Sequence, residues 1–168
     1  MAHELRLAQA KDVAACWAII KAAKDFQRQQ GFVQWTQDYP SEATIEDDVR
    51  AGKGYVFTVE GDIAGYMCVD FSGEPAYENI KGKWNTEEPY AVIHRMAFDA
   101  SYRGRSLSGV AVALIEELCR AKHVDAIRVD TDSQNKRMQH ILQKQGFAEC
   151  GVIVFQGSEK LAYDKKLA

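Results

Sequence analysis

The four cysteines of this 168-residue chain form no CxxC pair, because Cys16, Cys68, Cys119 and Cys150 lie far apart. Widely spaced single cysteines are typical of reduced thiols in a cytoplasmic protein and argue against a disulfide framework or a zinc site. The four histidines also lack the spacing of metal ligands. The sequence therefore predicts a cytoplasmic protein that binds no metal.

Long apolar runs and an excess of basic residues are missing as well. No apolar stretch approaches the length that spans a bilayer, and residues 1–6 are polar and charged, which argues against a secretory signal. The formal net charge is −3, whereas a nucleic-acid-binding domain usually carries a basic surface. We therefore expect neither nucleic acid nor a membrane as a partner.

The length and the periodicity predict one α/β domain over residues 1–168. No repeat or linker interrupts the chain, residues 32–40 form a polar, aromatic loop, and residues 72–89 form a long loop of a kind that is often functional. Apolar residues at helical spacing predict helices over 10–30, 41–51, 108–121 and 135–145. Runs of β-branched and aromatic residues predict strands over 4–7, 55–59, 63–71, 90–98, 124–131, 150–155 and 160–167. Glu60-Gly61-Asp62 predicts a hairpin turn between the second and third of these strands.

Residues 93–118 combine a strand, a turn of small residues and a helix N-terminus. The first N–H groups of a helix are unpaired and its dipole favours an anion, while small side chains let a phosphate approach the backbone. Arg103 and Arg105 add positive charge to this turn. The pattern favours a phosphate site, and the alternative is an ordinary strand-to-helix loop with solvated arginines.

This turn resembles the pyrophosphate loop of the GCN5-related N-acetyltransferase (GNAT) family. That loop reads Arg or Gln, two residues, Gly, one residue, then Gly or Ala. Arg103 matches its start, whereas Ser106 and Ser108 stand where Gly or Ala is usual. Both serines keep a small side chain and a backbone N–H, so the binding mechanism is retained.

A second stretch resembles the other signature of the same family. Asn135 opens a predicted helix that ends in Gly146-Phe147, at the family's spacing. Leu142 stands where the family often has a tyrosine, the usual general acid for the leaving thiolate. The order of strands and helices also follows the family over nearly the whole chain.

The resemblance implies a mixed, mostly antiparallel central sheet of about seven strands, with a splay between the two middle strands and four helices on its faces. It also implies acetyl-CoA as cosubstrate, with the pyrophosphate on the N–H groups of the turn and the pantetheine arm between strands 90–98 and 124–131. For Asn135 the alternative role is that of a helix N-cap. The implied cofactor residues are Met96, Ala97, Phe98, Arg103, Gly104, Arg105, Ser106, Leu107, Ser108, Gly109 and Asn135.

The function implied is that of an N-acetyltransferase, which moves the acetyl group to a primary amine of a small molecule or peptide by direct attack in a ternary complex. A non-catalytic acyl-CoA-binding sensor or assembly subunit is the alternative, because the tyrosine is replaced and the loop has serines for glycines. A dinucleotide binder is disfavoured, because the GxGxxG fingerprint is absent. Exposed sheet edges at the C-terminal strands would permit a homodimer.

Acetyl transfer to an amine requires a base, because an alkylamine with a pKa near about 10.4 is mostly charged at neutral pH. Strands covered on both faces are usually apolar, yet His94, Arg95, Arg128 and Asp130 lie in the two strands implied to flank the thioester. Alternation places Arg95 on the face of Ala97 and Arg128 on the face of Asp130. Our hypothesis is that His94 or Asp130 is the general base. The alternative is a structural ion-pair network or a satisfied core histidine.

Trp35, Tyr39 and Trp84 are candidates for the acceptor pocket, since they lie in polar loops and not at periodic core positions. The alternative is that these aromatic residues clamp loops onto the sheet. Tyr163 and Cys150 on the last strands are candidates to protonate the leaving thiolate in place of the missing tyrosine, although a buried cysteine more often serves packing.

Overall fold

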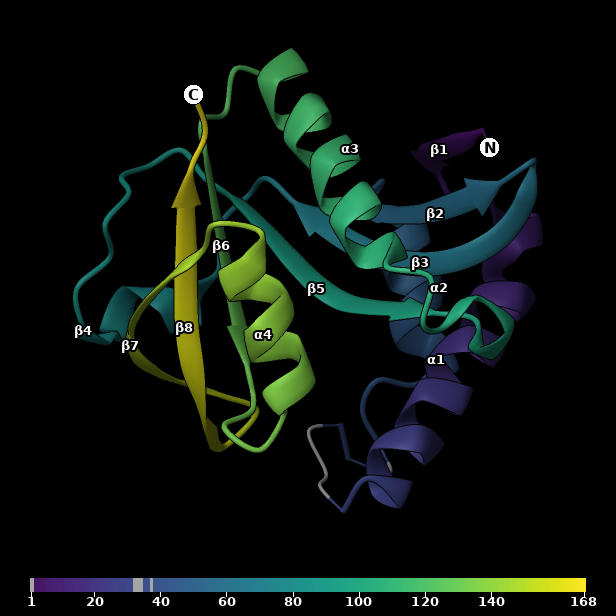
Figure 1. The fold of residues 1–168 in the computed structure, drawn as a ribbon, viewed down its shortest axis with the longest axis horizontal. Coiled ribbons are helices and arrows are strands. Elements are labelled where there is room, and N and C mark those ends of the chain that lie inside the picture. The colour runs from purple at the N-terminus through teal and green to yellow at the C-terminus, as the bar shows by residue number, and fades with distance from the viewer. Residues whose placement is uncertain (1, 32–34, 37) are drawn as a thin grey trace. The chain divides into compact units, whose positions relative to one another are not determined.

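The computed structural model describes residues 2–31, 35–36 and 38–168 (Figure 1). Residue 1 of the predicted polar N-terminus, and residues 32–34 and 37 of the predicted loop 32–40, lie outside the described residues. The chain forms two compact units. Unit 1 holds Met1–Val69 and His94–Ile115, and unit 2 holds Asp70–Ile93 and Glu116–Ala168.

The described strands pair in the order β1-β2-β3-β5-β6-β8-β7-β4, and the described residues also form four α-helices. Most strand pairs are antiparallel, as predicted, and β5 is parallel to β6. The sheet has one strand more than the predicted seven, because β4 (Lys81–Gly82) lies in the predicted loop 72–89. The same loop also contains a 3₁₀ helix, η2 (Pro75–Asn79). A strand of two residues has no periodicity, so the sequence gives no sign of it.

Unit 1 contains β1 (His3–Leu7), β2 (Gly54–Val59), β3 (Asp62–Asp70) and the second part of β5 (Ala91–Phe98). β2 pairs antiparallel with both β1 and β3. Glu60 and Gly61 join β2 to β3, and both have a positive φ, which is the geometry of a two-residue hairpin turn. The predicted hairpin is therefore confirmed.

The helices α1 (Val13–Gln29) and α2 (Glu42–Arg50) cover one face of these strands. The N-cap of α2 is Ser41, whose hydroxyl accepts a hydrogen bond from the Thr44 N–H. The buried cluster on this face contains Cys16, Ile19, Ile20, Trp35, Ile45, Val56, Tyr66 and Ala97. Helix α3 (Leu107–Ala121) starts in unit 1 and crosses in front of β2 and β3 in Figure 1.

Unit 2 contains the start of β5 with β6 (Ala126–Thr131), β7 (Ala148–Phe155), β8 (Ser158–Lys166) and α4 (Lys136–Lys144). β6 is parallel to β5 at Ala91↔Ile127 and Val92↔Arg128, and it is antiparallel to β8. One face of this sheet packs against residues 72–90 through a second buried cluster, which contains Tyr77, Tyr90, Val92, Ala126, Ile153 and Ala162.

The contact between β4 and β7 depends on two glycines. Gly82 and Gly151 pair across it with φ of +135° and +149°, and a Cβ at Gly151 would collide with the carbonyl oxygen of Lys81. We expect Gly151→Ala to separate β4 from β7 and to lower the free energy of unfolding by about 2–3 kcal/mol. Thermal unfolding measures this loss as a Tm lower by roughly 5–10 °C.

Gly157→Ala is the matched control for this prediction. Gly157 also has a positive φ, +75°, but no atom lies within 4 Å of a Cβ built there. Only the backbone penalty of about 1 kcal/mol then applies. Equal losses of Tm in the two variants would show that the close approach of β4 to β7 contributes nothing.

Candidate active site

The turn between β5 and α3 lies entirely in unit 1. After β5 the chain forms a short 3₁₀ helix, Ala100–Tyr102, whose N-cap Asp99 accepts a hydrogen bond of 2.9 Å from the Ser101 N–H. Residues 103–106, called loop 103–106 below, then lead into α3, and Gly104 and Ser106 have φ of +81° and +57°. Left-handed residues directly before a helix N-terminus turn backbone N–H groups into a concave anion site. The backbone of the loop thus has the geometry of an anion site, and the binding of a phosphate there stays a prediction.

Two aromatic rings hold the arginines of this loop. The Arg103 guanidinium lies 4.3 Å from the ring centroid of Phe26 in α1, and the Arg105 guanidinium lies 5.1 Å from that of Tyr102. Cation–π contacts of this kind restrain a flexible side chain while leaving its N–H donors available. Phe26 was missed by the sequence analysis, because it lies at a helical position 77 residues before Arg103.

The last two residues of β5 are anchored by their side chains. Ala97 belongs to the buried cluster under α1 and α2, and the Phe98 ring packs edge-on against Phe57 at a centroid distance of 5.7 Å. Gly65 of β3 lies so close that a Cβ there would meet the Phe98 ring. These contacts fix the backbone of this part of β5. His94 is half-buried two residues before Met96.

A buried ion pair joins β5 to α2. The Arg95 guanidinium donates to both carboxylate oxygens of Asp48, at 2.6 and 2.9 Å, and to the Tyr39 hydroxyl at 2.6 Å. Tyr66 donates to the same carboxylate at 2.7 Å. Burial alone would lower the pKa of Arg95, but the bond to Asp48 raises it above its ordinary value, so the arginine stays charged. Arg95 contacts α2, and Ala97 belongs to the buried cluster under the same helix. Arg95 and Ala97 therefore lie on the same face of β5, as predicted.

In unit 2, Asp130 of β6 accepts a hydrogen bond of 2.6 Å from the hydroxyl of Tyr77. Burial raises the pKa of Asp130, although the bond from Tyr77 and the charge of Lys160 act in the opposite direction. Tyr77 is 1% exposed, and burial and the neighbouring carboxylate raise its pKa well above its ordinary value. A carboxylate with a raised pKa is a better base near neutral pH.

Arg128 lies on the same face of β6 as Asp130, as the alternation of side chains predicted. Its contacts, however, act as a clamp that holds residues 84–90 against the strand. Its guanidinium lies over the rings of Trp84 and Tyr90, at 4.5 and 4.1 Å from their centroids. It also donates to the carbonyl oxygen of Thr86 at 2.6 Å and to the Thr86 hydroxyl at 3.1 Å. These contacts tie residues 84–90 to β6 and agree with the structural alternative for Arg128.

The three predicted acceptor residues fall into different environments. Trp35 is 9% exposed and belongs to the cluster under α1 and α2, so the prediction that it lies outside the core is wrong. Its backbone N–H donates a hydrogen bond to the Gln27 side chain of α1. Trp84 donates its indole N–H to the carbonyl oxygen of Tyr77, which makes it a clamp of its segment. Tyr39 is half-buried beside Arg95.

Asn135 caps helix α4. Its side-chain oxygen accepts a hydrogen bond of 3.1 Å from the Met138 N–H, which confirms the predicted N-cap. Leu142, at the family's tyrosine position, is 3% exposed and apolar, so it can donate no proton.

The two candidates to replace that tyrosine lie on the C-terminal strands. Burial and the nearby Asp164 raise the pKa of the Cys150 thiol to about 12. Burial likewise raises the pKa of Tyr163, which is 1% exposed. A raised pKa makes each a weaker proton donor than it would be in water.

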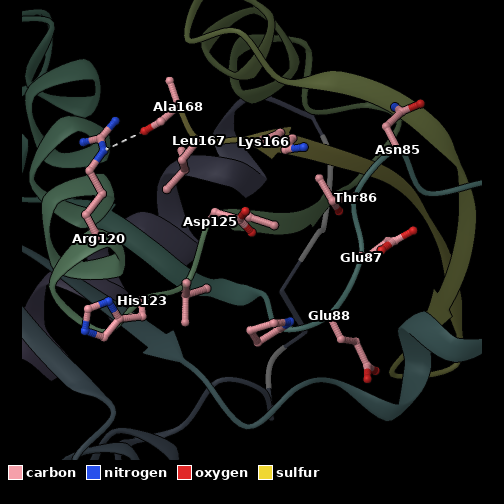
Figure 2. A pocket seen from close by; sticks show the side chains of 13 residues that line it. Asn85, Thr86, Glu87, Glu88, Arg120, His123, Asp125, Lys166, Leu167 and Ala168 are labelled. Atoms are coloured by element: carbon pink, nitrogen blue, oxygen red, sulfur yellow. Dashed lines mark hydrogen bonds between the residues drawn. The ribbon is translucent and has the colours of Figure 1, made fainter.

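Figure 2 shows a pocket of unit 2 with a volume of about 700 Å³. It is lined by residues 85–89, 123–126 and 166–168 and by Arg120. The start of β6 contributes to it, whereas Asp130 and Asn135 lie at and after the end of that strand. None of the predicted site residues lines this pocket.

Neither a metal centre nor a membrane span is found in the part of the chain that the structure describes. No group of three or more His, Cys, Asp or Glu side chains there is arranged to hold a metal ion. No helix in that part is long and apolar enough to cross a membrane.

Comparison with known proteins bears on the same residues. A sequence model of the acetyltransferase (GNAT) family matches residues 18–147, which include β5, loop 103–106, β6 and α4. The chain belongs to this family. The match includes both stretches on which the resemblance rested. No curated protein matches the chain in sequence.

Solved structures of GNAT acetyltransferases agree with this assignment. One from Streptococcus agalactiae is 32% identical, with a TM-score of 0.88, over 99% of this chain and 96% of its own. One from Listeria monocytogenes is 21% identical, with a TM-score of 0.77, over 98% of this chain and 95% of its own. The aminoglycoside acetyltransferase AAC(6')-Ib, solved with coenzyme A and kanamycin, is 20% identical, with a TM-score of 0.72, over 98% of this chain and 95% of its own. The last two likenesses concern the fold.

Proposed function

We propose that this GNAT protein transfers the acetyl group of acetyl-CoA to a primary amine of a small molecule or peptide. The observation that carries the proposal is loop 103–106, in which two left-handed residues and two ring-held arginines directly precede the N-terminus of α3. A pyrophosphate matches this arrangement in charge and in its need for N–H donors. AAC(6')-Ib, which has the same fold, was solved with acetyl-CoA and with aminoglycosides, which are amines.

The cofactor residues follow from this placement. The N–H groups of residues 103–109 bind the pyrophosphate, and Arg103 and Arg105 neutralise part of its charge. The backbone groups of Met96, Ala97 and Phe98 bind the pantetheine arm as an added strand would. Asn135 is a further ligand of the arm through its side-chain amide, since its oxygen caps α4 and its N–H₂ group is a donor.

In the reaction that we propose, the neutral amine nitrogen attacks the thioester carbonyl, a C–N bond forms, and the C–S bond then breaks. The CoA sulfur leaves with the bonding electrons and takes a proton, while the amine loses one. His94 or Asp130 accepts the proton of the amine, directly or through water. The proton donor to the thiolate is Tyr163 or Cys150, since Leu142 has no proton to give.

Both units belong to one catalytic domain in this proposal. The family match runs without a break over segments of unit 1 and unit 2. We therefore assign residues 1–168 to a single N-acetyltransferase domain. Tyr39 and Trp84 are proposed to contact the acceptor amine, and Trp35 supports the loop that carries Tyr39.

Calorimetric titration with acetyl-CoA and with CoA tests the cofactor part of the proposal. We expect micromolar binding by the wild type and a Kd about 30-fold higher, about 2 kcal/mol, in the double variant Arg103→Glu/Ser106→Glu. The charge-matched control is Lys166→Glu/Ser158→Glu, because both residues are exposed on β8. The control should bind as the wild type does.

Failure of the wild type to bind acetyl-CoA would overturn the proposed function. If it binds, amines are screened for release of the CoA thiol. Binding without turnover on any amine would favour the alternative, an acyl-CoA-binding sensor or assembly subunit, which the replacement of the tyrosine by Leu142 suggests.

A further inference from the structure

Arg95 has an unusual backbone conformation for its place in the chain. Five non-glycine residues in the described part of the chain have a positive φ, and four of them lie in turns or at helix ends. Arg95, with φ of +54°, lies inside strand β5. A residue with a long side chain rarely adopts this conformation, and it does so only where surrounding contacts hold it there.

Several contacts hold the side chain of Arg95. Its guanidinium makes a two-pronged ion pair with Asp48 and a hydrogen bond to Tyr39, and Tyr66 donates to the same carboxylate. The side chains of Arg95 and Asp48 are 10% and 9% exposed. The guanidinium is thus fixed from α2 and from the residue before Pro40, so the backbone to which it is attached has little freedom.

The position of Arg95 gives this arrangement a consequence for the cofactor. A left-handed residue within a strand rotates the peptide groups on its two sides relative to each other, as in a β-bulge. The next three residues, Met96, Ala97 and Phe98, are those whose backbone groups the proposed function assigns to the pantetheine arm. The conformation of Arg95 therefore sets the direction in which these groups point.

We propose that Asp48 is a positioning residue for β5, called the cofactor strand below. Its ion pair with Arg95 holds residue 95 in the left-handed conformation, called the bend below, which presents the backbone of residues 96–98 to acetyl-CoA. This inference rests on the proposed function. Asp48 itself touches no reacting atom in this scheme. Through Tyr39, the same guanidinium also links the proposed acceptor loop to the cofactor strand.

A purely stabilising pair would behave differently. Buried ion pairs can often be replaced by neutral side chains without loss of structure. The positioning role predicts instead that the affinity for CoA depends on the backbone conformation of residue 95. Glycine adopts a positive φ freely, whereas alanine does not. Glycine should therefore keep the bend without the ion pair, and alanine should lose it.

The test compares Asp48→Asn/Arg95→Gly with Asp48→Asn/Arg95→Ala. Both double variants lack the ion pair and leave no unpaired charge, so they differ in the backbone preference at position 95. We expect the glycine variant to bind CoA within about threefold of the wild type. The alanine variant should bind about tenfold more weakly, which corresponds to about 1.4 kcal/mol. Calorimetry gives Kd, and thermal unfolding shows that both variants are folded.

Equal affinities of the two double variants for CoA, whether high or low, would overturn the inference. If the wild type itself does not bind CoA, the proposed function fails and this inference fails with it. If the alanine variant does not fold, Asp48→Asn is compared with Asp47→Asn, whose carboxylate pairs with Arg50 at the surface. A Kd for CoA at least threefold higher for Asp48→Asn alone supports the inference, and equal values overturn it.

Discussion

Replacing Asp130 by asparagine is expected to lower kcat by a factor of roughly 10² or more while leaving the fold intact, because a positioned general base contributes about 10²–10⁴ to the rate. Asparagine cannot accept the proton of the amine, but it keeps an oxygen that accepts the hydrogen bond from Tyr77. The measurement is steady-state release of the CoA thiol with the amine that the screen identifies.

Thermal unfolding of the same variant serves as its control. The pKa of Asp130 is raised in the folded protein, so its contribution to stability is present below its unfolded pKa and is lost as the pH rises through the folded value. Asparagine is neutral at every pH. We therefore expect the variant to be as stable as the wild type at neutral pH, or more stable.

His94→Gln is measured in parallel, because His94 is the second candidate base. A large loss of kcat in only one of the two variants identifies the base. Turnover near the wild-type value in the double variant His94→Gln/Asp130→Asn would contradict the catalytic assignment of both residues.

Asp164→Ala is expected to lower the free energy of unfolding by about 3–5 kcal/mol, because it would leave buried donors unpaired. Asp164 of β8 is 2% exposed, and it accepts hydrogen bonds from the backbone N–H groups of Asn85 and Thr86 at 2.8 and 2.9 Å. The Thr86 hydroxyl donates to it at 2.9 Å and the Asn85 amide at 3.2 Å. Thermal unfolding should show a Tm lower by roughly 10 °C.

Glu159→Ala is the control, since Glu159 is an exposed acid on the same strand. It should change Tm by only about 1–2 °C. A similar Tm for the two variants would mean that Asp164 does not hold residues 85–86 to the sheet.

The loss of stability caused by Asp164→Ala should also depend on pH. Burial alone would raise the pKa of Asp164, but hydrogen bonds from Cys150, Thr86 and Asn85 lower it below the ordinary value of 3.8. A lowered folded pKa gives stability that is present above the unfolded pKa and is lost as the pH falls through the folded value. The difference in unfolding free energy between wild type and variant should therefore be largest above about pH 5 and should decrease as the pH falls below about 4.

Asp164 and Arg128 together explain why β6 and β8 carry charge on one face. Arg128 donates to Thr86, and Asp164 accepts from the same residue, so both strands hold residues 84–90. A segment with little secondary structure of its own cannot pair its backbone groups internally, and buried charged partners replace the missing bonds. The ionisable residues of β6 thus divide into a clamp, Arg128, and a catalytic candidate, Asp130.

The sequence by itself determined the features that depend on neighbours along the chain. It predicted the four helices, the hairpin at Glu60-Gly61, the cap at Asn135 and the turn of small residues before α3. These features follow from a few adjacent residues, because periodicity, turn chemistry and capping act within one or two turns. The family's signature stretches are equally local, which is why they could be found without the structure.

Only the tertiary structure decided which distant residues meet. Tyr77 and Asp130 lie 53 residues apart in the chain, Asp48 and Arg95 lie 47 apart, and Asn85 and Asp164 lie 79 apart. Hydrophobic periodicity places a side chain on a face but does not name its partner across the sheet. The tertiary structure also decided the left-handed conformation of Arg95. An arginine by itself disfavours a positive φ, and contacts from α2 hold the residue in that conformation.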